Sequence, residues 1–309
     1  MGKNTKFSVL QLSHPGLEYP GLNKKTGSLI YTKSGIAWNS TRDGGIRLWN
    51  NLKQHKRKFM RMKNVKYLDK NGQLITGEVT FWGEWEAQSK FELISQKSKN
   101  LGEPRLCHQP FFDRLYKGEK KHGTDPFIFG SNFWYTHCKQ SYKSARNLSP
   151  GSIVIFGSER NKDKKFLVDT ILVVEKRFTQ KEIRRNLNEF HSLLRINNFE
   201  IKNLINDESK SGYGFYRGKS FSQGEIFSFV PAKVISSARL GHGRLELDTE
   251  DPVHNFQKTG AGSVCRITRV FNSENELKDY WHCLANESFE NGFVLAHNFP
   301  MPKFKESYD

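Results

Sequence analysis

Residues 125–176 read DPFIFGSNFWYTHCKQSYKSARNLSPGSIVIFGSERNKDKKFLVDTILVVEK. A Pro150-Gly151 turn precedes one hydrophobic run, residues 153–156, and a second run follows at residues 166–174. Apolar runs bounded by turn residues predict a pair of buried β-strands. A short polar group at residues 135–140 comes before them. The stretch therefore predicts a sheet with a polar cluster at its side.

Four features of this stretch carry a resemblance to a known family: Asp125-Pro-Phe, the triplet Cys138-Lys-Gln, a polar linker that contains Ala145, and the run Pro150-Gly-Ser-Ile-Val-Ile-Phe-Gly-Ser. Together with the second strand they resemble the nucleotide-modification-associated domains, which are small α+β modules tied to modified bases in phage and bacterial DNA. The resemblance implies a protein that recognises or processes a nucleobase or nucleotide, in DNA modification or phage defence. The alternative is a DNA-binding reader without catalysis, or an interaction component of a defence system.

Composition points to a polyanionic partner. The 309 residues carry 49 Lys and Arg against 32 Asp and Glu, a formal net charge of +17. Such a charge attracts nucleic acid, although it also serves solubility alone. The resemblance implies that this nucleic acid is DNA. No run approaches the roughly 20 apolar residues of a membrane helix. Four scattered cysteines and no apolar export segment after Met1 predict a reduced, cytoplasmic setting.

Hydrophobic patterning predicts an α+β fold, with a mixed, mostly antiparallel sheet or partly closed barrel and flanking helices. Residues 7–12 are expected to form a strand, and residues 65–68 and 74–85 a hairpin around Asn71-Gly72. Helices are expected at 179–194 and 273–290, each with a capping box. We predict two domains, residues 1–198 and a smaller α+β domain at 199–309, because the pattern restarts between about residues 195 and 211.

A further helix is predicted at residues 45–63, where apolar residues recur at near-helical spacing and the other face is strongly basic. Such a face neutralises phosphates, or is simply solvated. The basic residues proposed to bind nucleic acid are Arg47, Lys53, Lys56, Arg57, Lys58 and Arg61.

Paired carboxylates give the leading catalytic hypothesis. Strand alternation places Glu84 and Glu86 on one face, where they would hold a divalent ion or act as general acid and base. The alternative is a solvated face that is paired with lysines. His14, in the loop after the first strand, is a second candidate base, or an inert loop histidine.

The polar cluster supplies the remaining site residues. Cys138 is a candidate nucleophile, and the alternative, which we favour, is a small buried residue within a binding site. Asp169 stands in a hydrophobic strand, where a carboxylate is costly unless it is paired. The other proposed binding residues are Tyr135, Lys139, Gln140 and Asp125.

Three Cys/His dipeptides, at residues 107–108, 137–138 and 282–283, raise the question of zinc. Neighbouring residues of a strand point to opposite faces, and the chain has no Cys-x-x-Cys. We therefore predict no metal site, and the sequence identifies no cofactor.

Overall fold

The computed structural model describes the following parts of the chain: residues 6–13, 31–32, 35–39, 46–48, 57–85, 89–94, 104, 106–113, 124–160, 164–186, 190, 205–235, 243–256 and 264–305. Of these, residues 31–48 are described as backbone strands only.

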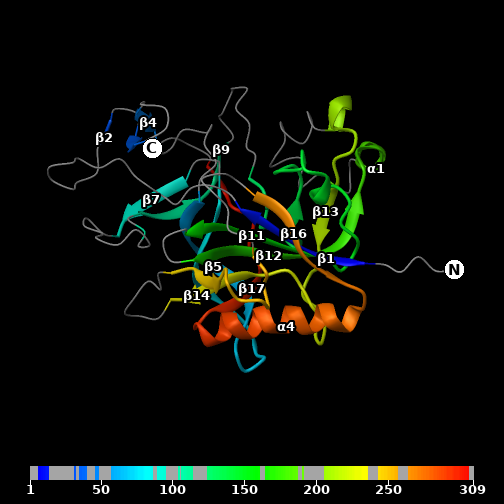
Figure 1. Ribbon diagram of the computed structural model, residues 1–309. Coiled ribbons are helices and arrows are strands. Elements are labelled where there is room, and N and C mark those ends of the chain that lie inside the picture. The colour runs from blue at the N-terminus through cyan, green and yellow to red at the C-terminus, as the bar shows by residue number, and fades with distance from the viewer. Residues whose placement is uncertain are drawn as a thin grey trace.

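Strands far apart in the sequence build the larger sheet (Figure 1). Within the described residues it has seven strands in the order β10-β13-β12-β11-β1-β16, and β15 also pairs with β12. β1 and β11 run parallel, whereas the other pairs are antiparallel. The strands are β1 (Phe7–Ser13), β10 (Trp134–Tyr135), β11 (Ile153–Arg160), β12 (Lys165–Phe178), β13 (Phe215–Gly218), β15 (Leu245–Asp248) and β16 (Val264–Phe271).

A second sheet has the order β17-β14-β6-β5-β8-β7 among the described strands. β17 pairs with β5 as well as with β14, so this sheet curls on itself, but the fold is no clean barrel. Its strands are β5 (Arg57–Leu68), β6 (Leu74–Glu84), β7 (Ser89–Leu93), β8 (Leu106–Pro110), β14 (Val230–Val234) and β17 (Val294–Asn298).

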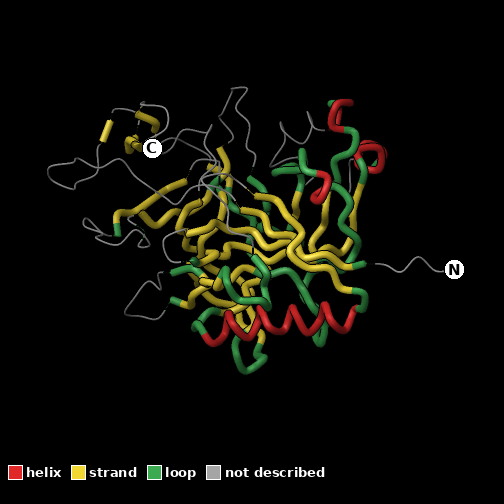
Figure 2. The backbone as a smooth tube through the Cα atoms, viewed as in Figure 1, coloured by secondary structure: helices red, strands yellow, loops and turns green. Residues whose placement is uncertain are grey.

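Short strands complete the described structure. They are β2 (Tyr31–Thr32), β3 (Gly35–Asn39) and β4 (Ile46–Leu48) in one small sheet, and β9 (Phe112–Asp113) with β18 (Phe304–Lys305) in another. The predicted sheet-rich α+β character, with mixed sheets and few helices, is confirmed (Figure 2).

The predicted hairpin is confirmed. Asp69 organises its turn, because its Oδ1 accepts hydrogen bonds from the backbone N–H groups of Asn71 and Gln73. Gly72 takes φ +77°, the left-handed conformation that glycine adopts without steric cost. The turn projects beyond α4 (Figure 1).

The basic helix predicted at residues 45–63 is wrong. The described part of this segment consists of strands β4 and β5. β5 pairs along its length with β6, and the adjacent residues Phe59 and Met60 are both buried, one on each face. Pairing with a distant strand and burial of both faces outweigh an apolar spacing that also fits a helix.

Both capped helices exist, with different lengths from those predicted. Thr179 and Glu182 form the capping box of α1 (Gln180–Arg185), which ends nine residues before the predicted end at 194. Ser273 and Glu276 cap α4 (Glu274–Glu290), which ends before Asn291 and Gly292 as predicted. The described residues also include two short 3₁₀ helices, η1 (Lys143–Ala145) and η2 (Glu208–Lys210).

The second predicted domain is not confirmed as a separate unit. β16 pairs with β1, β13 and β15 pair with β12, and β14 and β17 pair with β6 and β5. Strands from beyond residue 198 are therefore part of both large sheets. Helix α4 lays an apolar face with Leu277, Trp281 and Leu284 against one of the two main hydrophobic clusters.

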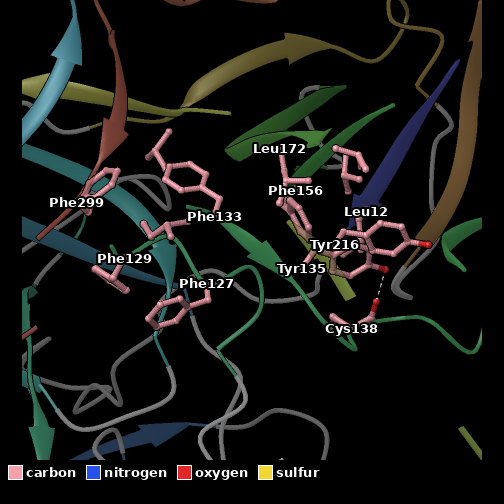
Figure 3. Close-up of a cluster of buried hydrophobic side chains, with 14 of the residues drawn as sticks. Leu12, Phe127, Phe129, Phe133, Tyr135, Cys138, Phe156, Leu172, Tyr216 and Phe299 are labelled. Atoms are coloured by element: carbon pink, nitrogen blue, oxygen red, sulfur yellow. Dashed lines mark hydrogen bonds between the residues drawn. The ribbon is translucent and has the colours of Figure 1, made fainter. Parts of the chain in front are cut away.

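Aromatic side chains dominate the other main cluster (Figure 3). Phe129 lies edge-on to Trp85 at 5.2 Å between ring centroids, and Phe81 packs on Phe299 at 4.7 Å. No helix among the described residues is long and apolar enough to cross a membrane.

Candidate nucleotide-binding site

A loop of residues 136–147 is anchored by one buried carboxylate. Asp125 accepts hydrogen bonds from three successive backbone N–H groups, those of Thr136, His137 and Cys138, at 2.9, 2.8 and 2.6 Å. Burial raises the pKa of Asp125, while nearby His137 and the three N–H groups oppose the rise. Asp125 thus fixes the backbone of the loop where it leaves β10.

The side chain of Gln140 clamps the same loop to the chain before β13. Its amide nitrogen donates to the carbonyl oxygens of Thr136 and Gly214, at 2.9 and 2.5 Å, and its amide oxygen accepts from the N–H of Gly214 at 2.7 Å. Arg146 adds a hydrogen bond to the carbonyl oxygen of Gln140 at 2.6 Å. Gln140 was predicted to bind a base, and its amide is occupied instead by the backbone.

Tyr135, also predicted to bind the ligand, lies in the core. Its side chain is fully buried and stacks on Tyr216 with 5.5 Å between ring centroids. Its hydroxyl donates to the carbonyl oxygen of Cys138 at 2.7 Å (Figure 3). The tyrosine therefore holds the loop in place from within the core.

The outer face of the loop is basic and carries an exposed aromatic ring. Tyr142 is 46% exposed, Lys143 is exposed, and Lys139 is half-buried. Lys139 has φ +58°, so the backbone reverses at this residue. Ser144 donates to the carbonyl oxygen of Cys265 at 3.3 Å, which docks the loop on β16 next to the exposed Arg266.

Cys138 is unsuited to nucleophilic attack. Burial raises the pKa of its thiol far above the usual value. The charges of Glu84 and Asp125 raise this pKa further, whereas the charges of Lys139 and Arg57 lower it. A thiol attacks as its thiolate, so a protonated thiol is a poor nucleophile.

Asp169 has the partners that its position in a hydrophobic strand requires. Arg57 of β5 donates through its Nε to Asp169 Oδ2, and Arg244 Nη2 lies 2.5 Å from Asp169 Oδ1. All three side chains are buried. Arg57 also donates to the carbonyl oxygen of Gly157, and Arg244 to Ser158 and the carbonyl oxygen of Leu167. This charged network ties together the two sheets.

Glu84 belongs to the same region. It is the last residue of β6, it is 8% exposed, and it pairs in register with Arg57. Trp82, two residues earlier, has a ring near the Arg244 guanidinium, and its buried Nε1 has no hydrogen-bond partner among the described residues. The buried carboxylate is not part of a solvated strand face.

The other two basic residues of β5 that were predicted to bind nucleic acid, Lys58 and Arg61, have partners within the protein. Lys58 is buried and its Nζ lies 3.4 Å from Ser89 Oγ, which in turn lies 2.7 Å from His108 Nδ1. Burial lowers the pKa of His108 well below its usual value. Arg61 forms an ion pair with Glu78 at 2.7 Å. Arg57 and Lys58 are therefore buried and do not form the predicted exposed phosphate-binding face, whereas Arg61 is half-buried and paired with Glu78.

Some predicted residues lie outside the described part of the chain: His14, Lys53, Lys56 and Glu86. Arg47 is described only as backbone in β4. Among the predicted residues, the structure pairs Arg57 with Asp169, places Glu84 opposite Arg57 in the sheet, and binds Asp125 to the backbone of Cys138.

Sequence reasoning missed Arg244 and the pair Tyr142 and Lys143. Arg244 follows a glycine-rich run, and nothing local marks it as the partner of a carboxylate 75 residues earlier. Tyr142 and Lys143 stand within the quoted stretch, and the basic and aromatic composition of SYKSAR was the signal available.

No family model, no curated protein and no solved structure matches this chain significantly.

Proposed function

We propose that this protein binds a nucleobase and its phosphate without covalent chemistry, as a nucleotide or within single-stranded nucleic acid, on the loop of residues 136–147. The observation that carries the proposal is the exposed Tyr142 between Lys139 and Lys143 on a fixed backbone. Aromatic rings stack on unpaired bases, and lysines neutralise the adjacent phosphates.

The rigidity of the loop supports a binding role. Asp125, Gln140 and Arg146 fix its backbone before any ligand arrives. A preorganised loop loses less conformational entropy on binding than a loop that must be ordered. The net charge of +17 further favours a polyanion, and the resemblance of residues 125–176 favours a modified base in phage or bacterial DNA.

Fluorescence anisotropy with labelled single-stranded and double-stranded oligonucleotides, over a range of salt concentrations, tests the proposal. Tyr142→Ala should weaken binding of the single strand by about 1–3 kcal/mol, the usual value for one stacked base. Lys143→Glu should weaken binding and reduce the dependence on salt, because a phosphate contact is lost. Lys70→Glu, an equal change of charge in the exposed hairpin turn, is the matched control.

Equal effects of Lys143→Glu and Lys70→Glu, with no effect of Tyr142→Ala, would show that only the overall charge attracts nucleic acid. Circular dichroism of each variant, compared with the wild type, establishes that the fold is unchanged.

A second candidate function, catalysis on the bound base, is favoured by Glu84. This carboxylate is buried beside Arg57, where a general acid or base would be shielded from water. Mass spectrometry of nucleosides after incubation with DNA tests it. An enzyme should release or alter a base, and Glu84→Gln should abolish turnover while oligonucleotide affinity is retained. Unaltered nucleosides with the wild-type protein would leave the binding role alone.

A further inference from the structure

A group of metal-ligating side chains lies on the side of the molecule that carries α4, away from the loop of residues 136–147. Asp251, His254 and Glu287 each offer one ligand atom, and these atoms all lie within 4.8 Å of one another. Cys283, one helical turn before Glu287, has its Sγ 3.5 Å from Glu287 Oε1. The three residues therefore offer one nitrogen and two carboxylate donors, and the sulfur atom of Cys283 lies beside Glu287 as a fourth candidate donor.

Local structure sets up these four donors in two pairs. Asp251 and His254 belong to one turn, in which the backbone N–H groups of His254 and Asn255 donate to the carbonyl oxygen of Asp251, at 3.2 and 3.0 Å. Cys283 and Glu287 are four residues apart on α4 and so share one face of the helix. His254 of the turn lies next to Glu287 of the helix, so side chains from both elements are in position to bind one metal ion.

The distances from Glu287 to His254 and to Cys283 are close to those between ligand atoms of a tetrahedral zinc site. Zn–N and Zn–O bonds of about 2.0–2.1 Å and a Zn–S bond of about 2.3 Å place ligand atoms roughly 3.3 Å apart for N and O, and roughly 3.5 Å apart for S and O. His254 Nε2 lies 3.0 and 3.1 Å from the two carboxylate oxygens of Glu287. The Cys283 to Glu287 distance of 3.5 Å agrees equally well.

The surroundings of His254 favour coordination through Nε2. Its Nδ1 lies 3.2 Å from the hydroxyl of Tyr280, and its ring stacks on Phe256 at 5.2 Å. Metal-bound histidines commonly donate their second N–H to such a partner, which fixes the ring and its tautomer. Arg269 is the nearby cation, and its guanidinium is engaged by the Tyr280 ring and the carbonyl oxygen of Pro252.

We propose that Asp251, His254, Cys283 and Glu287 bind one zinc ion, which fastens the turn at residues 251–254 to α4. The mixed set of imidazole, thiolate and carboxylate ligands suits zinc better than magnesium or calcium, which prefer oxygen atoms alone. This inference does not depend on the proposed nucleotide binding, because the two sites share no residue.

The test uses the full chain, stripped with a chelator and then titrated with zinc alone. Metal content after gel filtration should reach one equivalent per chain, and zinc should raise the melting temperature by at least about 2 °C. Replacement by cobalt should give a thiolate-to-cobalt charge-transfer band, which reports Cys283 directly. A chain that retains no zinc would overturn the proposal.

Two conservative variants identify the ligands. Cys283→Ser and Glu287→Gln alter side chains that are only partly buried, so both variants should fold. Each should weaken zinc binding at least roughly tenfold, and Cys283→Ser should also remove the charge-transfer band. His282→Ala is the matched control, because His282 is exposed and directly precedes Cys283 in the sequence. This variant should bind zinc like the wild type. Wild-type affinity in both ligand variants would contradict the assignment.

Discussion

A carboxylate in the middle of a hydrophobic strand requires a partner, and Asp169 has two. Arg57 and Arg244 reach it from β5 and from the residue before β15, and all three side chains are buried. Removal of one member of such a network leaves the others charged and with less compensation.

Asp169→Asn should therefore lower the free energy of unfolding by about 3–5 kcal/mol, because two buried guanidinium groups lose their counter-charge. Urea denaturation followed by tryptophan fluorescence measures the loss. Asp248→Asn, which breaks an exposed ion pair with Lys165, is the matched control and should shift the midpoint little. A similar shift for both variants would show that the network adds no stability.

His297 makes stability depend on pH. Burial, with a smaller effect of Lys66, lowers its pKa to about 4, and its Nε2 has no hydrogen-bond partner among the described residues. The unfolded chain takes up a proton near pH 6.5, whereas the folded chain does so only near pH 4. Stability from this group is thus complete above pH 6.5 and is lost as the pH falls toward 4.

His297→Phe should remove this dependence while the ring contact with Phe221, at 4.6 Å in the wild type, is retained. Between about pH 7 and pH 5 the wild type should lose on the order of 2 kcal/mol more stability than the variant. Chemical denaturation at a series of pH values measures the difference. Parallel profiles for the two proteins would contradict the assignment to His297.

At the scale of elements, signals that lie within a few residues were reliable. Both capping boxes and the turn at Asn71-Gly72 were predicted correctly, because each is formed by neighbours in sequence. The prediction of a basic helix at residues 45–63 was wrong for the opposite reason. Its conformation depends on β6, with which β5 pairs over ten residue pairs.

Ser273→Ala should lower stability by about 1 kcal/mol, because the N–H of Glu276 loses its acceptor at the start of α4. Asn286→Ala, in the exposed middle of the same helix, should leave stability unchanged or raise it, since alanine has the higher helix propensity. Thermal and urea denaturation compare the two. Equal losses would mean that the cap does not contribute.

At the scale of the whole molecule, both large sheets join the two parts of the chain on either side of residue 198. β1 pairs with β16, and β5 pairs with β17. A fragment of residues 1–198 would leave the edges of both sheets unpaired, and such edges promote aggregation.

We expect this fragment to be insoluble or unfolded when it is produced alone, and to recover when residues 199–309 are produced with it. Gel filtration and circular dichroism of the separate and co-produced fragments measure the outcome. A stable, monomeric fragment 1–198 would restore the division into two domains that hydrophobic patterning predicts.

The sequence by itself determined the strand pair after Pro150-Gly151, the hairpin, both helix caps and the need of Asp169 for a partner, because each depends on local geometry or on the cost of burying one charge. Only the tertiary structure decided which partners meet. Arg244 comes to Asp169, Tyr135 enters the core while Tyr142 is exposed, and His254 meets Glu287. These contacts join residues far apart in the chain, and no short pattern records which distant side chain shares a buried site.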